Sequence, residues 1–265
     1  MSTEAVAAAS ADERYRGYAG ELALRIYRPA PSAAPAVVVL FHGGGFVGGS
    51  LDGIAPLAAA MAARLDLAVA TPGYTLAGEL PFPAAVEDAY AAITWAVENA
   101  HREHWDSRRL VVAGVEAGGN LAAVAAMMAR DRGGPALAAQ ILVAPMLDPT
   151  LTSRSMQHFA ANASRSRGEC NACYRAYLPN AADRLHPYAA PSSCSRVAGL
   201  APALILTAEG DPLRDEAEAY GAKLITAGVT TQVSRLARIE AAKDTWTDEA
   251  WTIVAAFIGP RVANP

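Results

Sequence analysis

Three short segments of the chain carry side chains and spacings that suit catalysis. The first, GVEAG at residues 114–118, runs out of the apolar strand pattern LVVAG and into the Ala-rich helix pattern NLAAVAAMMAR. This is the strand–turn–helix context of a nucleophile elbow, whose flanking glycines let the chain hold its central residue in a strained conformation. The central residue here is the carboxylate Glu116.

The second segment is HGGGF at residues 42–46, directly after the strand pattern VVVLF. Its glycines leave backbone N–H groups able to point at a developing oxyanion. The third is GDPLRD at residues 210–215, directly after the strand pattern ALILTAE. The carboxylate of Asp211 is therefore expected at the carboxyl edge of a sheet, where α/β proteins bind ligands.

Together these segments, in this order, resemble the hormone-sensitive-lipase-like branch of the α/β hydrolases. The resemblance covers about residues 35–260 and is supported by Tyr74 in PGYTL and by the segment PFPAA at residues 81–85. It implies that Gly44, Gly45 and Ala117 supply the N–H groups of an oxyanion hole. It also implies that Asp211 is the acid of a catalytic triad.

The chain departs from that family at both reacting positions. The family has a serine where this chain has Glu116, and its triad histidine must follow Asp211. The last histidine here is His186, so a histidine at the expected place is missing. By spacing, Glu240 is expected at the histidine position, with Lys243 as the second choice.

Acyl transfer by the usual route needs a hydroxyl nucleophile and a base. We therefore expect an enzyme of lyase, isomerase, cyclase or epoxide-hydrolase type, in which Glu116 and Glu240 act as an acid/base pair with Asp211 nearby. The reaction would be cyclisation, elimination, isomerisation or epoxide opening. One alternative is a catalytically inactive ligand-binding protein, and a second is a weak esterase that uses a water-based route.

The expected ligand is a small apolar or oxygenated molecule, and no cofactor is implied. Its pocket would be lined by His42, Phe46, Tyr74, Tyr188 and Lys243, although His42 on the glycine loop suits a structural role better than a catalytic one. No metal site is expected. The three cysteines, at positions 170, 173 and 194, form only one close pair, whereas structural zinc usually has four ligands.

The elements around these segments predict a doubly wound α/β fold with a mostly parallel sheet. Strands are expected at residues 21–28, 36–41, 67–71, 109–114, 139–144, 203–208 and 230–236, and helices at 54–64, 83–100, 117–130, 213–227 and 245–258. Residues 1–20 are expected to form a flexible arm. Residues 21–148 and 199–265 would form the core, and 149–198, rich in Ser, Asn, Pro and Tyr, a small helical cap insertion.

Composition limits the remaining possibilities. The chain has 265 residues, is 52% hydrophobic and carries a formal net charge of -4 without a basic cluster, so a nucleic-acid partner is not expected. Its N-terminus lacks a signal-peptide pattern, and no apolar run reaches the roughly 18 residues of a membrane helix. An odd number of cysteines favours a cytoplasmic location. A homodimer is an expectation from the resemblance only.

Overall fold

The computed structural model describes residues 9–29, 35–159, 166–239 and 246–263. Its centre is an eight-stranded sheet in the order β1-β2-β4-β3-β5-β6-β7-β8. The strands from β4 to β8 pair in parallel, whereas β2 pairs antiparallel with both β1 and β4. Their bounds are β1 Ala9–Arg16, β2 Glu21–Arg28, β3 Ala36–Phe41, β4 Ala68–Pro72, β5 Asp106–Val115, β6 Ala139–Val143, β7 Ala203–Ala208 and β8 Thr231–Leu236.

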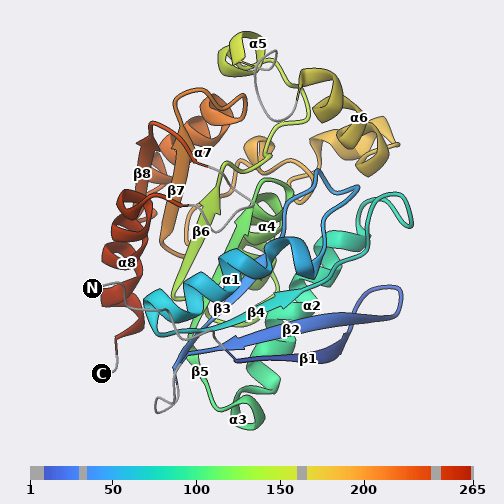
Figure 1. The fold of residues 1–265 in the computed structure, drawn as a ribbon. Coiled ribbons are helices and arrows are strands. Elements are labelled where there is room, and N and C mark those ends of the chain that lie inside the picture. Colours follow the sequence, from blue (N-terminus) through green and yellow to red (C-terminus); the bar gives the residue numbers. More distant parts are fainter. Residues whose placement is uncertain (1–8, 30–34, 160–165, 240–245, 264–265) are drawn as a thin grey trace.

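The inner strands are buried on both faces, as their unbroken apolar sequences predict. All residues of β3, β4, β6 and β7 are buried. Side chains of α1 and α8 pack with one face of the sheet, and those of α2, α4 and α7 pack with the other. The result is the three-layer sandwich of Figure 1, which confirms the predicted α/β class.

The helices begin and end close to the predicted positions. They are α1 Leu51–Leu65, α2 Ala84–Glu98, α3 Ala100–Glu103, α4 Ala117–Asp131, α5 Arg154–Phe159, α6 Arg167–Tyr177, α7 Arg214–Thr226 and α8 Asp248–Val262. Two short 3-10 turns, η1 Ala181–Leu185 and η2 Pro191–Ser193, precede β7. Side-chain caps start several helices: Ser50 accepts from Gly53 N–H before α1, and Ser166 forms a capping box with Glu169 at α6.

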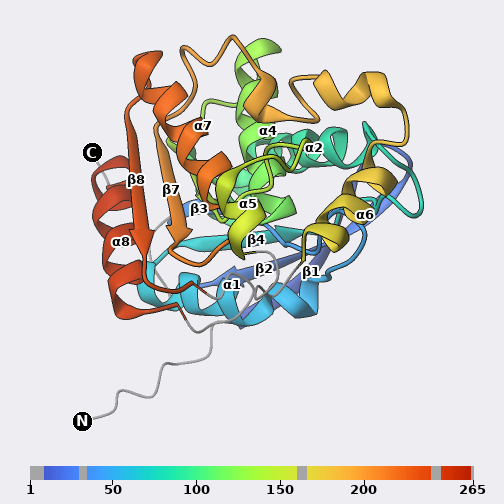
Figure 2. The same cartoon turned by 90° about the horizontal axis from the view of Figure 1, so that it is seen from above.

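Between β6 and β7 the chain leaves the sheet and forms α5, α6 and both 3-10 turns. In Figures 1 and 2, α5 and α6 lie beyond the carboxyl ends of the central strands. These elements fall within residues 149–198, the segment predicted to form a cap. The cap thus stands over the strand ends that carry the elbow and the glycine loop.

The N-terminal stretch differs from the predicted arm. Residues 9–16 form strand β1, which pairs with β2 over its whole length. Tyr15 is buried and its hydroxyl donates to the Gly73 carbonyl at 2.6 Å, while Asp12 forms an ion pair with Arg25. Most side chains of this stretch are polar, and for that reason a flexible arm was predicted. Polar side chains are also typical of an edge strand.

Candidate active site

The elbow is formed as predicted, with Glu116 between β5 and α4. Glu116 has φ 56° and ψ -113°, a left-handed conformation that a side-chain-bearing residue adopts only at a cost. The neighbouring chain holds it there: its N–H donates to the Val143 carbonyl at 2.9 Å, and its carbonyl accepts from Met146 N–H at 3.0 Å. The side chain of Glu116 is thereby fixed at the carboxyl end of the sheet.

Two glycines make the elbow sterically feasible. A Cβ on Gly114 would lie 2.0 Å from the Gly118 carbonyl oxygen, and one on Gly118 would lie 2.2 Å from the Phe41 carbonyl oxygen. Both neighbours are backbone atoms that cannot rotate away. The G-x-E-x-G spacing therefore reflects close packing of α4 against the ends of β5 and β3.

The glycine loop after β3 also takes the predicted form. Gly44 and Gly45 have φ 118° and 62°, and a Cβ on Gly44 would lie 2.3 Å from the Gly48 carbonyl oxygen. Val47 and Gly48 donate their N–H groups to the Gly44 carbonyl. The loop thus turns tightly at the carboxyl edge of β3.

The loop and the elbow meet through one hydrogen bond. The N–H of Gly44, a predicted oxyanion-hole donor, donates to Oε2 of Glu116 at 2.8 Å. A carboxylate oxygen therefore lies where this donor would hold the oxygen of a substrate. Gly43 lies against the same oxygen, since a Cβ built there would approach Oε2 to 2.9 Å.

Asp211 lies beside this pair, in the turn after β7. Its Oδ1 accepts from Leu213 N–H at 2.8 Å, which orients the carboxylate. Burial raises the pKa of Asp211 above its usual value, the Leu213 hydrogen bond lowers it, and the charge of Glu116 raises it further. The charge of Glu116 thus acts on Asp211, so the two carboxylates lie within electrostatic reach of each other.

His42 and Tyr74 form a stacked pair under the glycine loop. Their rings are 4.3 Å apart between centroids, and the Tyr74 hydroxyl donates to the His42 carbonyl at 3.1 Å. Both side chains are buried, and burial lowers the pKa of the His42 imidazole, which favours its neutral form. Burial raises the pKa of Tyr74 and the charge of Glu116 raises it further, so this hydroxyl lies within electrostatic reach of Glu116. Position and contacts agree with the structural role favoured for His42.

Two residues predicted to line the pocket make other contacts. Phe46 is fully buried and stacks on Tyr177 of α6, with 3.9 Å between ring centroids, so it joins the glycine loop to the cap. Tyr188 donates to Asp131 Oδ2 at 2.9 Å. Asp131 is the last residue of α4, about 20 Å along the helix from the elbow. The Tyr188 hydroxyl therefore points along α4 away from the elbow, although the carbonyl of the next residue, Ala189, accepts from Asn120 Nδ2 at 3.2 Å in the first turn of α4.

Glu240 and Lys243, the two candidates for the histidine position, lie outside the described residues. Their assignment stays a prediction. The described part of the site around Glu116 therefore consists of the elbow, the glycine loop, Asp211 and Tyr74.

One buried acid near the site escaped the sequence interpretation. Glu216 of α7 is 5% exposed, and its Oε1 accepts from the N–H groups of Leu147 and Asp148 at 2.7 and 3.2 Å. Burial raises the pKa of Glu216 to about 8. In the sequence, Glu216 is marked only by its position directly after Asp215. The packing of α7 against the loop after β6 shows that the Glu216 side chain points inward.

Within the described parts of the chain, no group of three or more His, Cys, Asp and Glu side chains is arranged to hold a metal ion. The three cysteines are buried and free. The helices of these same parts are too short or too polar to cross a bilayer.

Fold, elbow and glycine loop together define an α/β hydrolase. A model of the α/β hydrolase fold family matches residues 38–239, and the chain belongs to that family. The chain is 40% identical over 226 residues to the carboxylic ester hydrolase LipN of Mycobacterium tuberculosis, covering 83% of this chain and 60% of the relative. It is 39% identical over 233 residues to the carboxylesterase NlhH of the same species, covering 84% of this chain and 72% of the relative.

A third relative is the ethyl acetate hydrolase of Pseudomonas putida, with 36% identity over 217 residues, which are 80% of this chain and 68% of the relative. Solved structures agree. A thermostable carboxylesterase cloned from a metagenomic library superposes with a TM-score of 0.93 at 32% identity, covering 99% of this chain and 92% of the other. A thermostable esterase from Pseudomonas putida gives 0.92 at 29% identity, covering 100% and 86%.

These relatives correct the expected chemistry. Their names support a hydrolase of esters. The expectations of a cyclase, lyase, isomerase or epoxide-opening enzyme, and of a catalytically inactive binding protein, were therefore wrong. They rested on the expected replacement of both the family's serine and its histidine, and gave too little weight to the relatedness of the remaining chain.

Proposed function

We propose that this protein hydrolyses small carboxylic esters by activating a water molecule at the elbow. In this proposal Glu116 stands in the place of the family's serine, and no histidine serves as the base, because none follows His186. The observation that carries it is the Glu116 carboxylate, fixed at the elbow by its hydrogen bond from Gly44 N–H. The esterase names of several relatives support the reaction class.

The reaction needs no covalent intermediate. Glu116 takes a proton from a water molecule while the water oxygen bonds to the ester carbonyl carbon. The tetrahedral intermediate then collapses, its bond to the alkoxide breaks, and the alkoxide takes the proton back from Glu116. The products are an acid and an alcohol, and Glu116 returns to its carboxylate form.

The other groups of the site stabilise charge and orient the reactants. Gly44 N–H already holds Glu116 Oε2, so Gly45 and Ala117 would hold the carbonyl oxygen as negative charge develops on it. Asp211, which interacts electrostatically with Glu116, would accept the second hydrogen of the water. Tyr74 closes the site on the side of the loop.

The test is hydrolysis of p-nitrophenyl acetate and of ethyl acetate, with the uncatalysed rate subtracted. Glu116→Gln keeps the shape of the side chain and removes the base, so we expect kcat/KM to fall by at least about 100-fold. Glu79→Gln is the matched control, since Glu79 is exposed on a loop and should keep the parent rate. No hydrolysis by the parent chain, or equal rates for Glu116→Gln and the parent, would overturn the proposal.

A further inference from the structure

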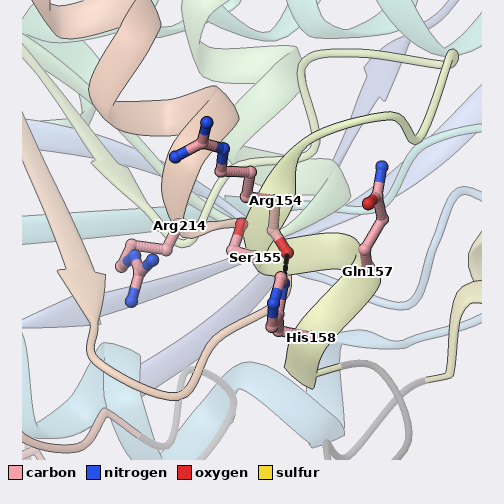
Figure 3. A pocket seen from close by; sticks show the side chains of 5 residues that line it. All are labelled: Arg154, Ser155, Gln157, His158 and Arg214. Carbon is pink, nitrogen blue, oxygen red and sulfur yellow. Dashed lines mark hydrogen bonds between the residues drawn. The ribbon is translucent and has the colours of Figure 1, made fainter.

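A pocket lies between the cap helix α5 and the start of α7, next to the site just described. Its volume is about 470 Å³, which is within the range of small-molecule sites. Four lining residues come from α5 and one from α7, namely Arg154, Ser155, Gln157, His158 and Arg214. We refer to it as the basic pocket. Figure 3 shows Arg154, Ser155 and His158 on the part of α5 that faces Arg214.

The floor of the basic pocket is held firmly to the turn after β7. Ser155 donates its N–H to Asp215 Oδ2 at 2.8 Å, and Asp215 returns its own N–H to Ser155 Oγ at 3.1 Å. The Ser155 hydroxyl also donates to the Pro212 carbonyl at 2.7 Å. These reciprocal bonds are buried or partly buried, so they fix α5 on α7 and preorganise the pocket.

The charge of the basic pocket is positive, because its lining contains two arginines and no acid. Arg214 pairs with Asp215 at 2.8 Å, which offsets its charge. Over the described residues, the guanidinium of Arg154 forms no ion pair, and its side chain is exposed toward solvent. The pocket thus presents one uncompensated guanidinium, a group whose planar fork matches a carboxylate.

The basic pocket adjoins the catalytic carboxylates through the turn that forms its floor. Arg214 donates its N–H to the Asp211 carbonyl at 3.1 Å. The pKa of Asp211 is raised by the charge of Glu116 and lowered by that of Arg214, so Asp211 lies within electrostatic reach of both. Asp211 at one end of this turn belongs to the site around Glu116, and Arg214 at its other end lines the basic pocket.

We propose that the basic pocket binds a carboxylate of the substrate, and that the preferred substrates are half-esters of short dicarboxylic acids. Glu116 and Asp211 repel an anionic substrate, and Arg154 offsets that repulsion at a distance from the ester bond. The guanidinium orients the substrate, so that its ester end lies at the elbow. This inference rests on the proposed ester hydrolysis.

The experiment compares kcat/KM for monomethyl glutarate, which is anionic, with that for neutral dimethyl glutarate. Arg154→Gln should lower the anionic-to-neutral ratio about tenfold, which corresponds to the loss of one charge-assisted hydrogen-bonded contact. Arg154→Lys should restore part of the ratio, and higher salt should lower it in the parent. Arg175→Gln, an exposed arginine of the other cap helix, is the matched control and should keep the parent ratio.

Binding of glutarate, followed by titration calorimetry, tests the pocket without any turnover. We expect glutarate to bind the parent and Arg175→Gln and to bind Arg154→Gln about tenfold more weakly. If glutarate binds in this way but neither ester is hydrolysed, the basic pocket stands and the proposed function fails. If dimethyl glutarate is hydrolysed but Arg154→Gln matches Arg175→Gln in ratio and in glutarate binding, the proposed function stands and the pocket is refuted.

Discussion

At the scale of single residues, the Glu116 side chain does two things: it places a carboxylate at the elbow, and it accepts a hydrogen bond from the glycine loop. It lies at the elbow, where the proposed function places the base, and its Oε2 accepts a hydrogen bond from Gly44 N–H. The same donor is one of those that would stabilise an oxyanion. The cost of placing a carboxylate at the elbow is therefore one fewer donor for the substrate.

This arrangement predicts chemical rescue. Glu116→Ala removes the base and leaves Gly44 N–H facing the space of the lost CH2–COO⁻ group, which has the size of acetate. Formate or acetate added to this variant should bind there and restore hydrolysis of p-nitrophenyl acetate in proportion to its concentration, with propionate less effective because it is larger than the lost group. Initial rates at increasing formate, against equal chloride, measure the effect. Equal rates in formate and chloride would contradict it.

Glu216 is the second residue whose surroundings determine its chemistry. Its Oε2 is buried without a hydrogen-bond partner within the described structure, and the Tyr174 hydroxyl is in the same state. The charge of Glu216 contributes to the raised pKa of Tyr174, so α7 and the cap helix α6 approach each other here. A protonated Glu216 suits this apolar place better than a carboxylate does.

Glu216 predicts a pH dependence of stability. The unfolded chain loses this proton near pH 4.5 and the folded chain near pH 8, so folding weakens as pH rises across that window and levels off above it. Glu216→Gln does not titrate. The free energy of unfolding of this variant relative to that of the parent should rise by about 4 kcal/mol between the two pH values.

Urea unfolding at a series of pH values measures this difference. Glu98→Gln, at an exposed position at the end of α2, is the control, and its difference from the parent should stay constant across the same pH range. A constant difference for Glu216→Gln as well would show that Glu216 titrates normally in the folded protein.

At the scale of elements, close packing of α4 against the ends of β3 and β5 holds the elbow in place. Gly114→Ala would bring a Cβ to 2.0 Å from the Gly118 carbonyl oxygen, so the elbow would have to move. We expect a loss of about 3 kcal/mol or more in the free energy of unfolding. Gly78→Ala is the control, since no heavy atom lies within 4 Å of its added Cβ. Urea midpoints that shift equally for the two variants would refute this account.

The sequence predicted those elements whose burial leaves a local signature. Continuous apolar runs identified the inner strands, and the glycine spacing identified the elbow, because both constraints act within a few residues. Strand β1 was missed because most of its residues are polar, with Asp12, Glu13 and Arg14 in a row, and it lies at the edge of the sheet. The stretch from Ala9 to Arg16 is a strand only because β2 offers it a partner.

The positions of Tyr188, Glu216 and Arg154 could not be predicted in this way. Tyr188 resembled a pocket residue, yet its hydroxyl bonds Asp131 at the far end of α4. Glu216 is buried because the loop after β6 covers it, and Arg154 lines a pocket because Ser155 ties α5 to α7. Each position depends on a contact between segments that are far apart in sequence. The two residues of these contacts are separated by 69, 60 and 57 positions.

At the scale of the whole molecule, the sheet is closed on one side by β1. This strand covers the hydrogen-bonding edge of β2, whose Leu24 and Ile26 belong to the core. Tyr15 adds a buried ring and a hydrogen bond to Gly73. Exposed strand edges promote association with other chains. The N-terminal strand therefore contributes both to stability and to keeping this edge closed.

Deletion of residues 1–16 should expose this edge. We expect the free energy of unfolding of the shortened chain to fall by about 2 kcal/mol or more, because the burial of Tyr15 is lost. We also expect the shortened chain to form larger species than the full chain does. Light scattering after size exclusion, together with thermal unfolding, measures both effects. Asp12→Asn is the control, because it weakens only the exposed pair with Arg25, and such pairs contribute about 1 kcal/mol or less. If the shortened chain eluted and melted like the full chain, this account would be wrong. The edge of β2 would then not promote association, and β1 would add nothing to stability.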